Sequence, residues 1–138
     1  MYNVLFIEDE RVMVEALPAA LEQYGLHVDA TTSIEEGTSW FTDRSIDAVL
    51  LDIGMPPSAN MDAQVVRFGR ETGVEVARQL HGRKPRIPII ALTVVYDAAI
   101  KARVREAGTC EIINKPAEPS YIAETIIKAI KRADGLIK

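Results

Sequence analysis

The stretch LLDIGMPPSANMDAQ, residues 50–64, begins as a buried strand and then loses every regular pattern. With Ala48 and Val49, its first residues form an apolar, partly β-branched run that ends at one acid, Asp52. Short apolar runs of this kind are typical of strands covered on both faces, as in a parallel sheet. We therefore expect a buried strand over residues 48–51 that delivers one carboxylate to its carboxyl end.

Apolar runs and amphipathic segments alternate along the rest of the chain. Short apolar runs predict further strands at residues 4–7, 28–32, 87–93 and 110–113. Apolar residues at helical spacing predict helices at residues 12–24, 33–41, 72–82, 96–108 and 119–133. Five strands alternating with five helices indicate a parallel sheet with helices on both faces. The expected fold is a doubly wound α/β domain, with the less apolar second strand at an edge.

Local signals mark the starts and interiors of some of these helices. Ser33 with Glu36, and Thr72 with Glu75, match the capping-box pattern, in which each side chain bonds the other residue's backbone N–H. Pro18 lies inside the first helix, where a proline removes one backbone hydrogen bond at a cost of about 3 kcal/mol. We expect a kink at Pro18 or a helix that accepts the missing bond.

The composition is that of one globular domain. The chain has 138 residues, 48% of them hydrophobic, and a net charge of −4. The negative charge argues against direct nucleic-acid binding and against attachment to an anionic membrane surface. No run approaches the roughly 18 apolar residues of a membrane span, and the N-terminus carries acids where a signal peptide needs a basic start. We expect a cytoplasmic domain without membrane insertion and, since the sequence ends soon after the last helix, without an output domain.

Cys110 is the single cysteine of the chain. One cysteine excludes an internal disulfide and fits a reducing compartment. Because Cys110 stands in an apolar run, we expect its thiol to be buried as a small hydrophobic side chain.

Polar side chains follow four of the five expected strands. Glu8 and Asp9 come after the first strand, Asp52 after the third, Thr93 ends the fourth, and Lys115 follows the fifth. Taken singly, these residues could cap a helix, begin a turn or be solvated loop charges. In open α/β sheets, however, ligands bind at the carboxyl ends of the strands. Three carboxylates gathered there repel one another unless a cation compensates them.

This set of side chains suits phosphoryl chemistry. Carboxylate oxygens near a backbone carbonyl make a Mg²⁺ site that keeps several waters and leaves room for a phosphate. Asp52, on the central strand, is best placed to attack phosphorus and form an aspartyl phosphate. Lys115 would supply positive charge to the phosphoryl oxygens, and Thr93 would supply a hydrogen bond.

The motifs that carry these residues resemble the receiver domain of two-component response regulators. They are the acidic pair Glu8 and Asp9, LLDIGMP around Asp52, ALT ending in Thr93, and NKP containing Lys115. The resemblance covers nearly the whole chain, so we expect one receiver domain over residues 1–138. It implies a flavodoxin-like sheet in the strand order 2-1-3-4-5.

The resemblance also implies a function in phosphorelay signal transduction. A sensor histidine kinase or a phosphotransfer protein would pass a phosphoryl group to Asp52. Mg²⁺ (or Mn²⁺) would be bound by Asp9, Asp52 and the carbonyl of Gly54, with Glu8 acting partly through water. The phosphoryl group would draw in Thr93 and reshape the surface of the fourth helix, fifth strand and fifth helix, which a downstream protein effector or output domain would read. Such a phosphoprotein is a switch that phosphorylates and dephosphorylates itself, not a turnover enzyme.

The sequence departs from the family pattern at three places. Ile112 stands where the family usually has Tyr or Phe on the fifth strand, so an aromatic gate is absent. Val94 stands next to Thr93 where the family favours a small residue, and its branched side chain could hinder water. Residues 57–72 form an insertion between the third strand and the third helix.

The insertion has two possible interpretations. Met61, Val65 and Phe68 fall at helical spacing, which favours a surface elaboration that packs locally. Alternatively, the insertion is a flap beside Asp52, in which Arg67 or Arg70 meets a phosphoryl group or an acidic partner.

Three other functions are alternatives to phosphorylation. A receiver-like interaction domain that signals by binding alone stays an alternative, favoured by Ile112 and Val94. A phosphatase of the haloacid-dehalogenase type needs a DxD pattern after the first strand, whereas this chain has Glu8, Asp9 and Glu10. A flavodoxin-like cofactor binder needs a hydroxyl- or glycine-rich phosphate loop there, and acids repel phosphate. These last two functions are set aside.

Overall fold

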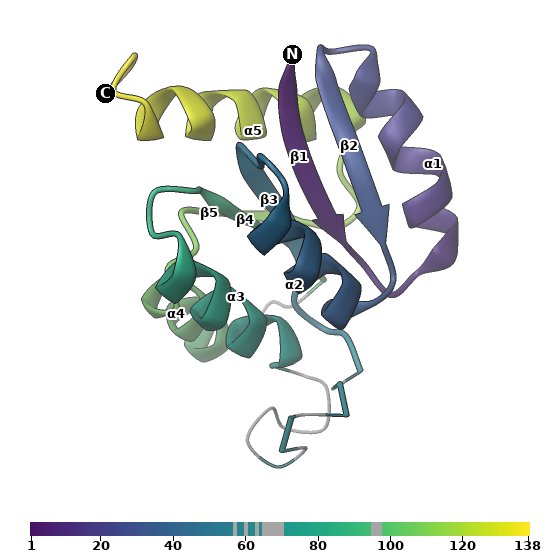
Figure 1. Ribbon diagram of the computed structural model, residues 1–138, viewed down its shortest axis with the longest axis vertical. Helices are drawn as coiled ribbons and strands as arrows, with labels where there is room; N and C mark the ends of the chain where they lie inside the picture. Colours follow the sequence, from purple (N-terminus) through teal and green to yellow (C-terminus); the bar gives the residue numbers. More distant parts are fainter. Residues whose placement is uncertain (57, 60, 63, 65–70, 95–97) are drawn as a thin grey trace.

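Strands and helices alternate along the computed structural model, which describes residues 1–56, 58, 59, 61, 62, 64, 71–94 and 98–138 (Figure 1). The strands are β1 (Tyr2–Ile7), β2 (Leu26–Thr31), β3 (Ala48–Asp52), β4 (Ile89–Thr93) and β5 (Glu111–Asn114). The helices are α1 (Arg11–Glu22), α2 (Ile34–Asp43), α3 (Thr72–Arg83), α4 (Ala98–Glu106) and α5 (Pro119–Ala133). None of these helices is both long and apolar enough to cross a membrane.

The five strands form one parallel sheet in the order β2-β1-β3-β4-β5. This order confirms the predicted doubly wound fold and places β2 at an edge. Alternate side chains of each strand point to opposite faces, so the sheet has a core cluster on each side. Leu5 and Ile7 of β1 pack with α2, α3 and α4, whereas Val4 and Phe6 pack with α1 and α5.

The predicted capping signals are only half present. The Glu36 N–H donates to Ser33 Oγ at 3.1 Å, as predicted, and α2 begins there. The Glu36 carboxylate, however, accepts from the Thr31 hydroxyl at 2.7 Å, and Thr31 also accepts from the Ser33 N–H. The capping box at Thr72 is wrong, because Glu71 occupies the N-cap of α3 and the buried Thr72 hydroxyl has no partner among the described residues. Pro18 lies within α1, which continues through it.

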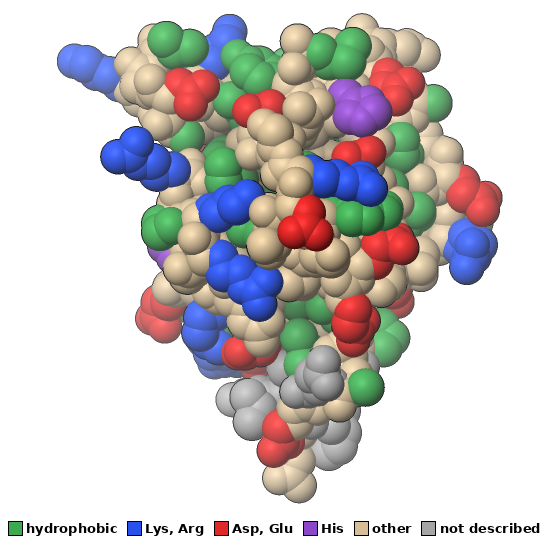
Figure 2. Space-filling model, in the orientation of Figure 1, with side chains coloured by type: hydrophobic (Ala, Val, Ile, Leu, Met, Phe, Trp, Pro, Cys, Tyr) green, Lys and Arg blue, Asp and Glu red, His purple; other side chains and the backbone are tan. Residues whose placement is uncertain are grey.

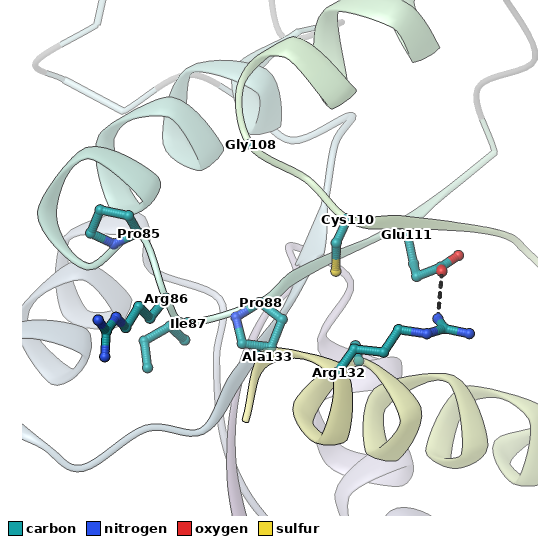
Figure 3. Close-up of a pocket in the computed structure, with 10 residues that line it drawn as sticks. Pro85, Arg86, Ile87, Pro88, Gly108, Cys110, Glu111, Arg132 and Ala133 are labelled. Atoms are coloured by element: carbon teal, nitrogen blue, oxygen red, sulfur yellow. Dashed lines mark hydrogen bonds and ion pairs between the residues drawn. The ribbon is translucent and has the colours of Figure 1, made fainter. Parts of the chain in front are cut away.

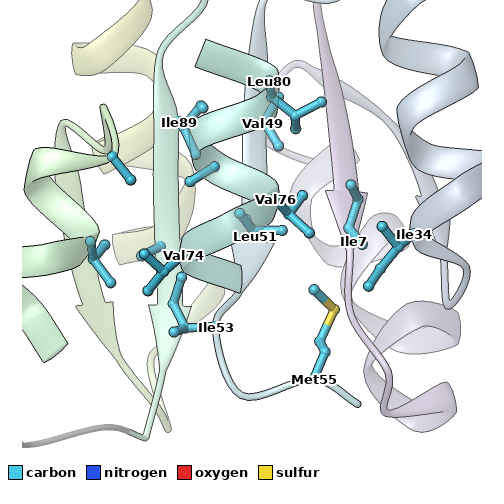
Figure 4. Close-up of a cluster of buried hydrophobic side chains, with 14 of the residues drawn as sticks. Ile7, Ile34, Val49, Leu51, Ile53, Met55, Val74, Val76, Leu80 and Ile89 are labelled. Carbon is cyan, nitrogen blue, oxygen red and sulfur yellow. The ribbon is translucent and has the colours of Figure 1, made fainter. Parts of the chain in front are cut away.

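The first turn of α3 lies directly on the backbone of β3. Val74, Val76 and Leu80 of α3 face Leu51 and Ile53 in one apolar cluster (Figure 4). At Gly73 the two backbones touch: the Gly73 N–H donates to the Ile53 carbonyl at 2.9 Å. A Cβ at Gly73 would lie 2.4 Å from Ile53 Cα and 2.6 Å from the Asp52 carbonyl oxygen. Only glycine therefore lets α3 approach the end of β3 this closely.

We expect Gly73→Ala to lower the free energy of unfolding by about 1–3 kcal/mol, because the new methyl group meets backbone atoms that cannot turn aside. Gly82→Ala is the matched control, since Gly82 lies in the same helix with open space around its Cα. A methyl group there should raise the free energy of unfolding by about 0.5–1 kcal/mol. Urea unfolding followed by circular dichroism measures both values, and equal shifts in the two variants would contradict the close approach.

Candidate functional site

Three carboxylates meet at the carboxyl edge of the sheet. Glu8 and Asp9 follow β1, and Asp52 ends the neighbouring strand β3. One carboxylate oxygen from each of the three residues lies within 4.8 Å of the others. Glu8 and Asp52 are buried, whereas Asp9 is exposed. The cluster therefore has two deep acids and one that faces solvent.

The ammonium group of Lys115 reaches into this cluster from the other side. Its Nζ lies 2.8 and 2.9 Å from the two Glu8 oxygens and 3.6 Å from Asp52 Oδ1. The Lys115 backbone N–H donates to the Thr93 carbonyl at 2.8 Å, so the ends of β4 and β5 are tied together. The Gly54 N–H donates to Asp52 Oδ1 at 3.2 Å. All six residues singled out from the sequence thus lie at one edge of the sheet.

Burial is the main reason that the pKa values of the two buried acids are raised. The pKa of Asp52 rises to about 8, because burial and, to a lesser degree, the carboxylates of Asp9 and Glu8 raise it against the opposing charge of Lys115. Burial also raises the pKa of Glu8, and Lys115 opposes this shift. Burial alone would lower the pKa of Lys115, but the Glu8 and Asp52 carboxylates raise it overall. One ammonium group does not balance three carboxylates.

The donor set fits a divalent metal ion. Three ionised carboxylates and one ammonium group leave two negative charges, and carboxylate oxygens are the ligands that Mg²⁺ and Mn²⁺ prefer. The exposed Asp9 side chain leaves the cluster open on one side, so an ion bound there can keep water or bind a phosphate. The raised pKa of Asp52, which burial causes first and the neighbouring carboxylates second, is a shift that a bound divalent cation would oppose.

The residues that depart from the family pattern lie in different environments. Val94, next to Thr93, is 60% exposed, whereas Ile112 is half-buried against the core cluster beneath α3 and α4. Met61, from the first part of the insertion, packs against the same cluster, in line with local packing. Val65, Arg67, Phe68 and Arg70, on which both interpretations of the insertion depend, lie outside the described residues.

Sequence reasoning missed one charged pair next to this site. Glu71 at the N-cap of α3 forms an ion pair with Arg103 of α4. A pair separated by 32 residues leaves no local pattern in the sequence. The nearest signal was the acid that precedes the third helix, which has the ordinary explanation of a favourable helix start.

The prediction for Cys110 is wrong, because the residue is exposed. Strand β5 begins at Glu111, so Cys110 lies in the connection before the strand. Its thiol points into a cavity of about 470 Å³ beside Pro88 and Ala133, where Arg132 pairs with Glu111 (Figure 3). This cavity lies at the amino ends of β4 and β5, at the opposite end of the sheet from Asp52.

The face covered by α2 and α3 carries charges of both signs. Figure 2 shows Lys and Arg side chains interspersed with Asp and Glu side chains over this face. Two of the basic side chains in this part of the chain are engaged within the protein: Arg78 pairs with Glu75, and Lys84 donates to the Phe41 carbonyl at 2.6 Å. This face therefore has a mixed charge and no continuous basic stripe among its described residues.

Comparison with known proteins agrees with this geometry. The family model described as "Response regulator receiver domain" matches residues 4–127. The KDP operon transcriptional regulatory protein KdpE of Escherichia coli (strain K12) is 28% identical over 132 residues, covering 96% of this chain and 52% of KdpE. The transcriptional regulatory protein ResD of Bacillus subtilis (strain 168) is 28% identical over 131 residues, covering 95% of this chain and 49% of ResD. The chain spans about half the length of these curated relatives.

Solved structures share the fold. A CheY-like response regulator receiver domain protein from Methanospirillum hungatei JF-1 superposes with a TM-score of 0.83 at 20% identity, covering 99% of both chains. A response regulator receiver domain protein from Clostridium thermocellum superposes with a TM-score of 0.81 at 26% identity, covering 99% of this chain and 100% of that chain.

We expect Asp52→Asn to stabilise the protein in metal-free buffer at pH 8, by about 1–3 kcal/mol, because it removes one buried like charge. The folded protein keeps the Asp52 proton up to about pH 8, whereas the unfolded chain releases it near the ordinary value of 3.8. Wild-type stability should therefore fall as the pH rises from 4 to 8, since ionisation favours the unfolded chain over this range.

Urea unfolding in EDTA across this pH range measures the effect. The profile of Asp52→Asn should be flatter than that of the wild type, and Mg²⁺ should restore wild-type stability at pH 8. Asp43→Asn, which changes an exposed acid outside the cluster, is the control and should follow the wild-type profile. If the free energy of unfolding varied with pH in the same way for all three proteins, the ionisation of Asp52 would not oppose folding.

Proposed function

The chain belongs to the family of response regulator receiver domains, and from this premise we propose that it is a phosphorylation-dependent switch whose phosphoacceptor is Asp52. A sensor histidine kinase or a phosphotransfer protein donates the phosphoryl group. The phosphorus–nitrogen bond of its phosphohistidine breaks as a bond forms between phosphorus and an Asp52 oxygen. The chain acts on itself and is not a turnover enzyme.

The observation that supports this function is the place of Asp52 between two acids and one cation. Asp52 ends the central strand, Glu8 and Asp9 directly follow the neighbouring strand β1, and Lys115 Nζ lies 3.6 Å from Asp52 Oδ1. A carboxylate held in this way cannot be a simple surface charge, because it is only 5% exposed. Phosphoryl transfer has a use for all three carboxylates and for the ammonium group. A purely structural role gives no reason to keep three carboxylates that repel one another in one place.

The other residues of the site take complementary roles. Asp9, Asp52 and the Gly54 carbonyl would hold Mg²⁺ or Mn²⁺, with Glu8 acting partly through water, and the ion would supply positive charge to the oxygens of the transferring group. Lys115 exchanges part of its contact with Glu8 for a phosphoryl oxygen, and the Thr93 hydroxyl donates a hydrogen bond to another. The Gly54 N–H holds the Asp52 carboxylate in place through the hydrogen bond to Oδ1.

The readout of the switch is the surface formed by α4, β5 and α5. Thr93 ends β4 and is joined through its carbonyl to Lys115, just after β5, so a movement of Thr93 is passed to this surface. Ile112 replaces the usual aromatic residue, and its half-buried side chain packs against the core cluster. The rearrangement is therefore a shift of packed elements and not the flip of a ring. A downstream effector protein or an output domain binds the altered surface, and a cytoplasmic location fits these partners.

A receiver-like domain that signals by binding alone is the second candidate. Val94 favours it, because its 60% exposed side chain stands beside the phosphoacceptor site where it can hinder an incoming group. The same position also suits slow loss of phosphate, since water must approach the acyl phosphate from the open side of the site.

Beryllofluoride or acetyl phosphate with Mg²⁺ distinguishes the two functions. We expect a Mg²⁺-dependent adduct with the wild type and none with Asp52→Asn. Lys115→Met should lower the occupancy of beryllofluoride by about tenfold or more, because it removes the cation that faces the adduct. Fluorine NMR and intact-protein mass spectrometry measure the adducts. Absence of an Asp52-dependent adduct in the wild type would favour signalling by binding alone.

We expect Val94→Ala to lose phosphate from Asp52 faster than the wild type, by roughly threefold or more, because a smaller side chain admits water. The rate is measured by following the phosphorylated protein after removal of the phosphodonor. Leu136→Ala, which trims an exposed apolar side chain near the C-terminus, is the control and should match the wild type. A Val94→Ala rate equal to that of the wild type would show that Val94 does not shield the acyl phosphate.

A further inference from the structure

The ion pair of Glu71 with Arg103, here called the α3–α4 ion pair, joins two helices at the edge of the functional site. Glu71 is the N-cap residue of α3, and Arg103 lies in α4. The Glu71 side chain is 7% exposed and that of Arg103 is 33% exposed. This pair is therefore much less accessible than the surface pair of Arg78 with Glu75, whose side chains are 58% and 25% exposed.

Burial makes the α3–α4 ion pair a strong link between the two helices. Exposed ion pairs contribute little, because water and salt screen them. A buried carboxylate, in contrast, is costly unless a cation and hydrogen-bond donors stay close to it. Glu71 also lies at the amino end of α3, where the helix dipole favours a negative charge. Any movement of α4 away from α3 must therefore expose the Glu71 carboxylate to solvent or leave it buried without its cation.

The other side of this link reaches the backbone of the phosphoacceptor. Gly73, two residues after Glu71, donates to the Ile53 carbonyl at 2.9 Å. There is no space for even a methyl group between Gly73 and the Asp52 carbonyl oxygen. Because close-packed backbone cannot be compressed, a shift of Asp52 or Ile53 must move the first turn of α3 and Glu71 with it.

Two further contacts hold α4 against α3. Ile100 and Val104 of α4 are buried in the cluster that contains Ile53 and Val74. Beyond the end of α4, Gly108 packs closely against the ring of His81, since a Cβ at Gly108 would lie 2.3 Å from His81 Cγ. These contacts fix how closely α3 and α4 approach each other, whereas the α3–α4 ion pair has a defined partner and direction. The ion pair is therefore the contact that sets the position of α4 along α3.

We propose that the α3–α4 ion pair is a positioning pair that couples the backbone at Asp52 to α4. The path runs from Asp52 and Ile53 through Gly73 to Glu71, and from Glu71 across to Arg103. Glu71 and Arg103 contact neither the phosphoryl group nor the metal ion; they transmit the change at Asp52 to the surface that partners bind. This inference rests on the proposed function and adds a second route to α4 beside that through Thr93.

Hydrogen exchange of α4 tests this coupling. Exchange of backbone amides in residues 98–106 is measured by mass spectrometry, with Mg²⁺ alone and with Mg²⁺ and beryllofluoride. The variants are Glu71→Gln and Arg103→Met, which break the pair, and Arg103→Lys, which keeps the charge without the planar guanidinium. Arg105→Met is the matched control, because Arg105 is an exposed residue of the same helix. Fluorine NMR reports separately whether beryllofluoride binds at Asp52.

In the wild type, we expect beryllofluoride to change the exchange rates of α4 by about threefold or more. Glu71→Gln and Arg103→Met should bind beryllofluoride but lose most of this response. Arg103→Lys should give an intermediate response, and Arg105→Met should respond like the wild type. If Glu71→Gln or Arg103→Met does not fold, the intermediate response of Arg103→Lys decides the question. A merely structural pair would lower stability without changing the response of α4.

Two results would overturn the coupling while leaving the proposed function standing. One is an unchanged α4 response in folded variants that lack the pair. The other is an adduct at Asp52 in the wild type with no change in α4 exchange. Absence of any adduct in the wild type is a different failure, because it removes phosphorylation itself and the coupling with it.

Discussion

Repulsion among carboxylates at one edge of the sheet is the constraint on which the rest of the structure depends. Glu8 and Asp52 are buried, and Asp9 lies within reach of both. Among the residues that the structure describes, the cation in contact with them is Lys115, which lies 107 positions along the chain from Glu8. This contact joins the loop after β1 to the loop after β5 across the carboxyl edge of the sheet. The fold and the electrostatics of the site therefore depend on each other.

The doubly wound topology explains how the chain holds this cluster. Parallel strands place all their carboxyl ends at the same edge, and apolar side chains on both faces keep that edge rigid. The packing of the core therefore offsets the repulsion among the carboxylates, as is usual where buried like charges serve a function. A divalent ion bound at the cluster would lower this repulsion, and metal binding would then raise the stability of the folded domain.

At the junction between β3 and α3, close backbone packing and a buried charged pair lie next to each other. The insertion ends at this junction, where Gly73 lies on the Asp52 backbone and Glu71 pairs with Arg103. The segment that precedes α3 leaves the carboxylate cluster undisturbed only if the end of the segment has a fixed position. The close approach at Gly73 and the buried pair at Glu71 fix this position, and they bring α4 into contact with the same point.

Local patterns in the sequence determined the strands, the helices and the residues at the strand ends. Apolar runs and helical spacing are properties of neighbouring residues, so they predicted the sheet and placed Asp52, Lys115 and their partners at one edge. Tertiary contacts decided what no neighbour encodes: the pairing of Glu71 with Arg103 and the buried start of α3, where packing on Ile53 replaced the expected cap. The pKa of Asp52 belongs to the second group, because it depends on burial and on charges that follow two other strands, β1 and β5. The electrostatic energy of two charges depends on the distance between them, and only the folded chain sets the distances between Asp52 and its charged neighbours.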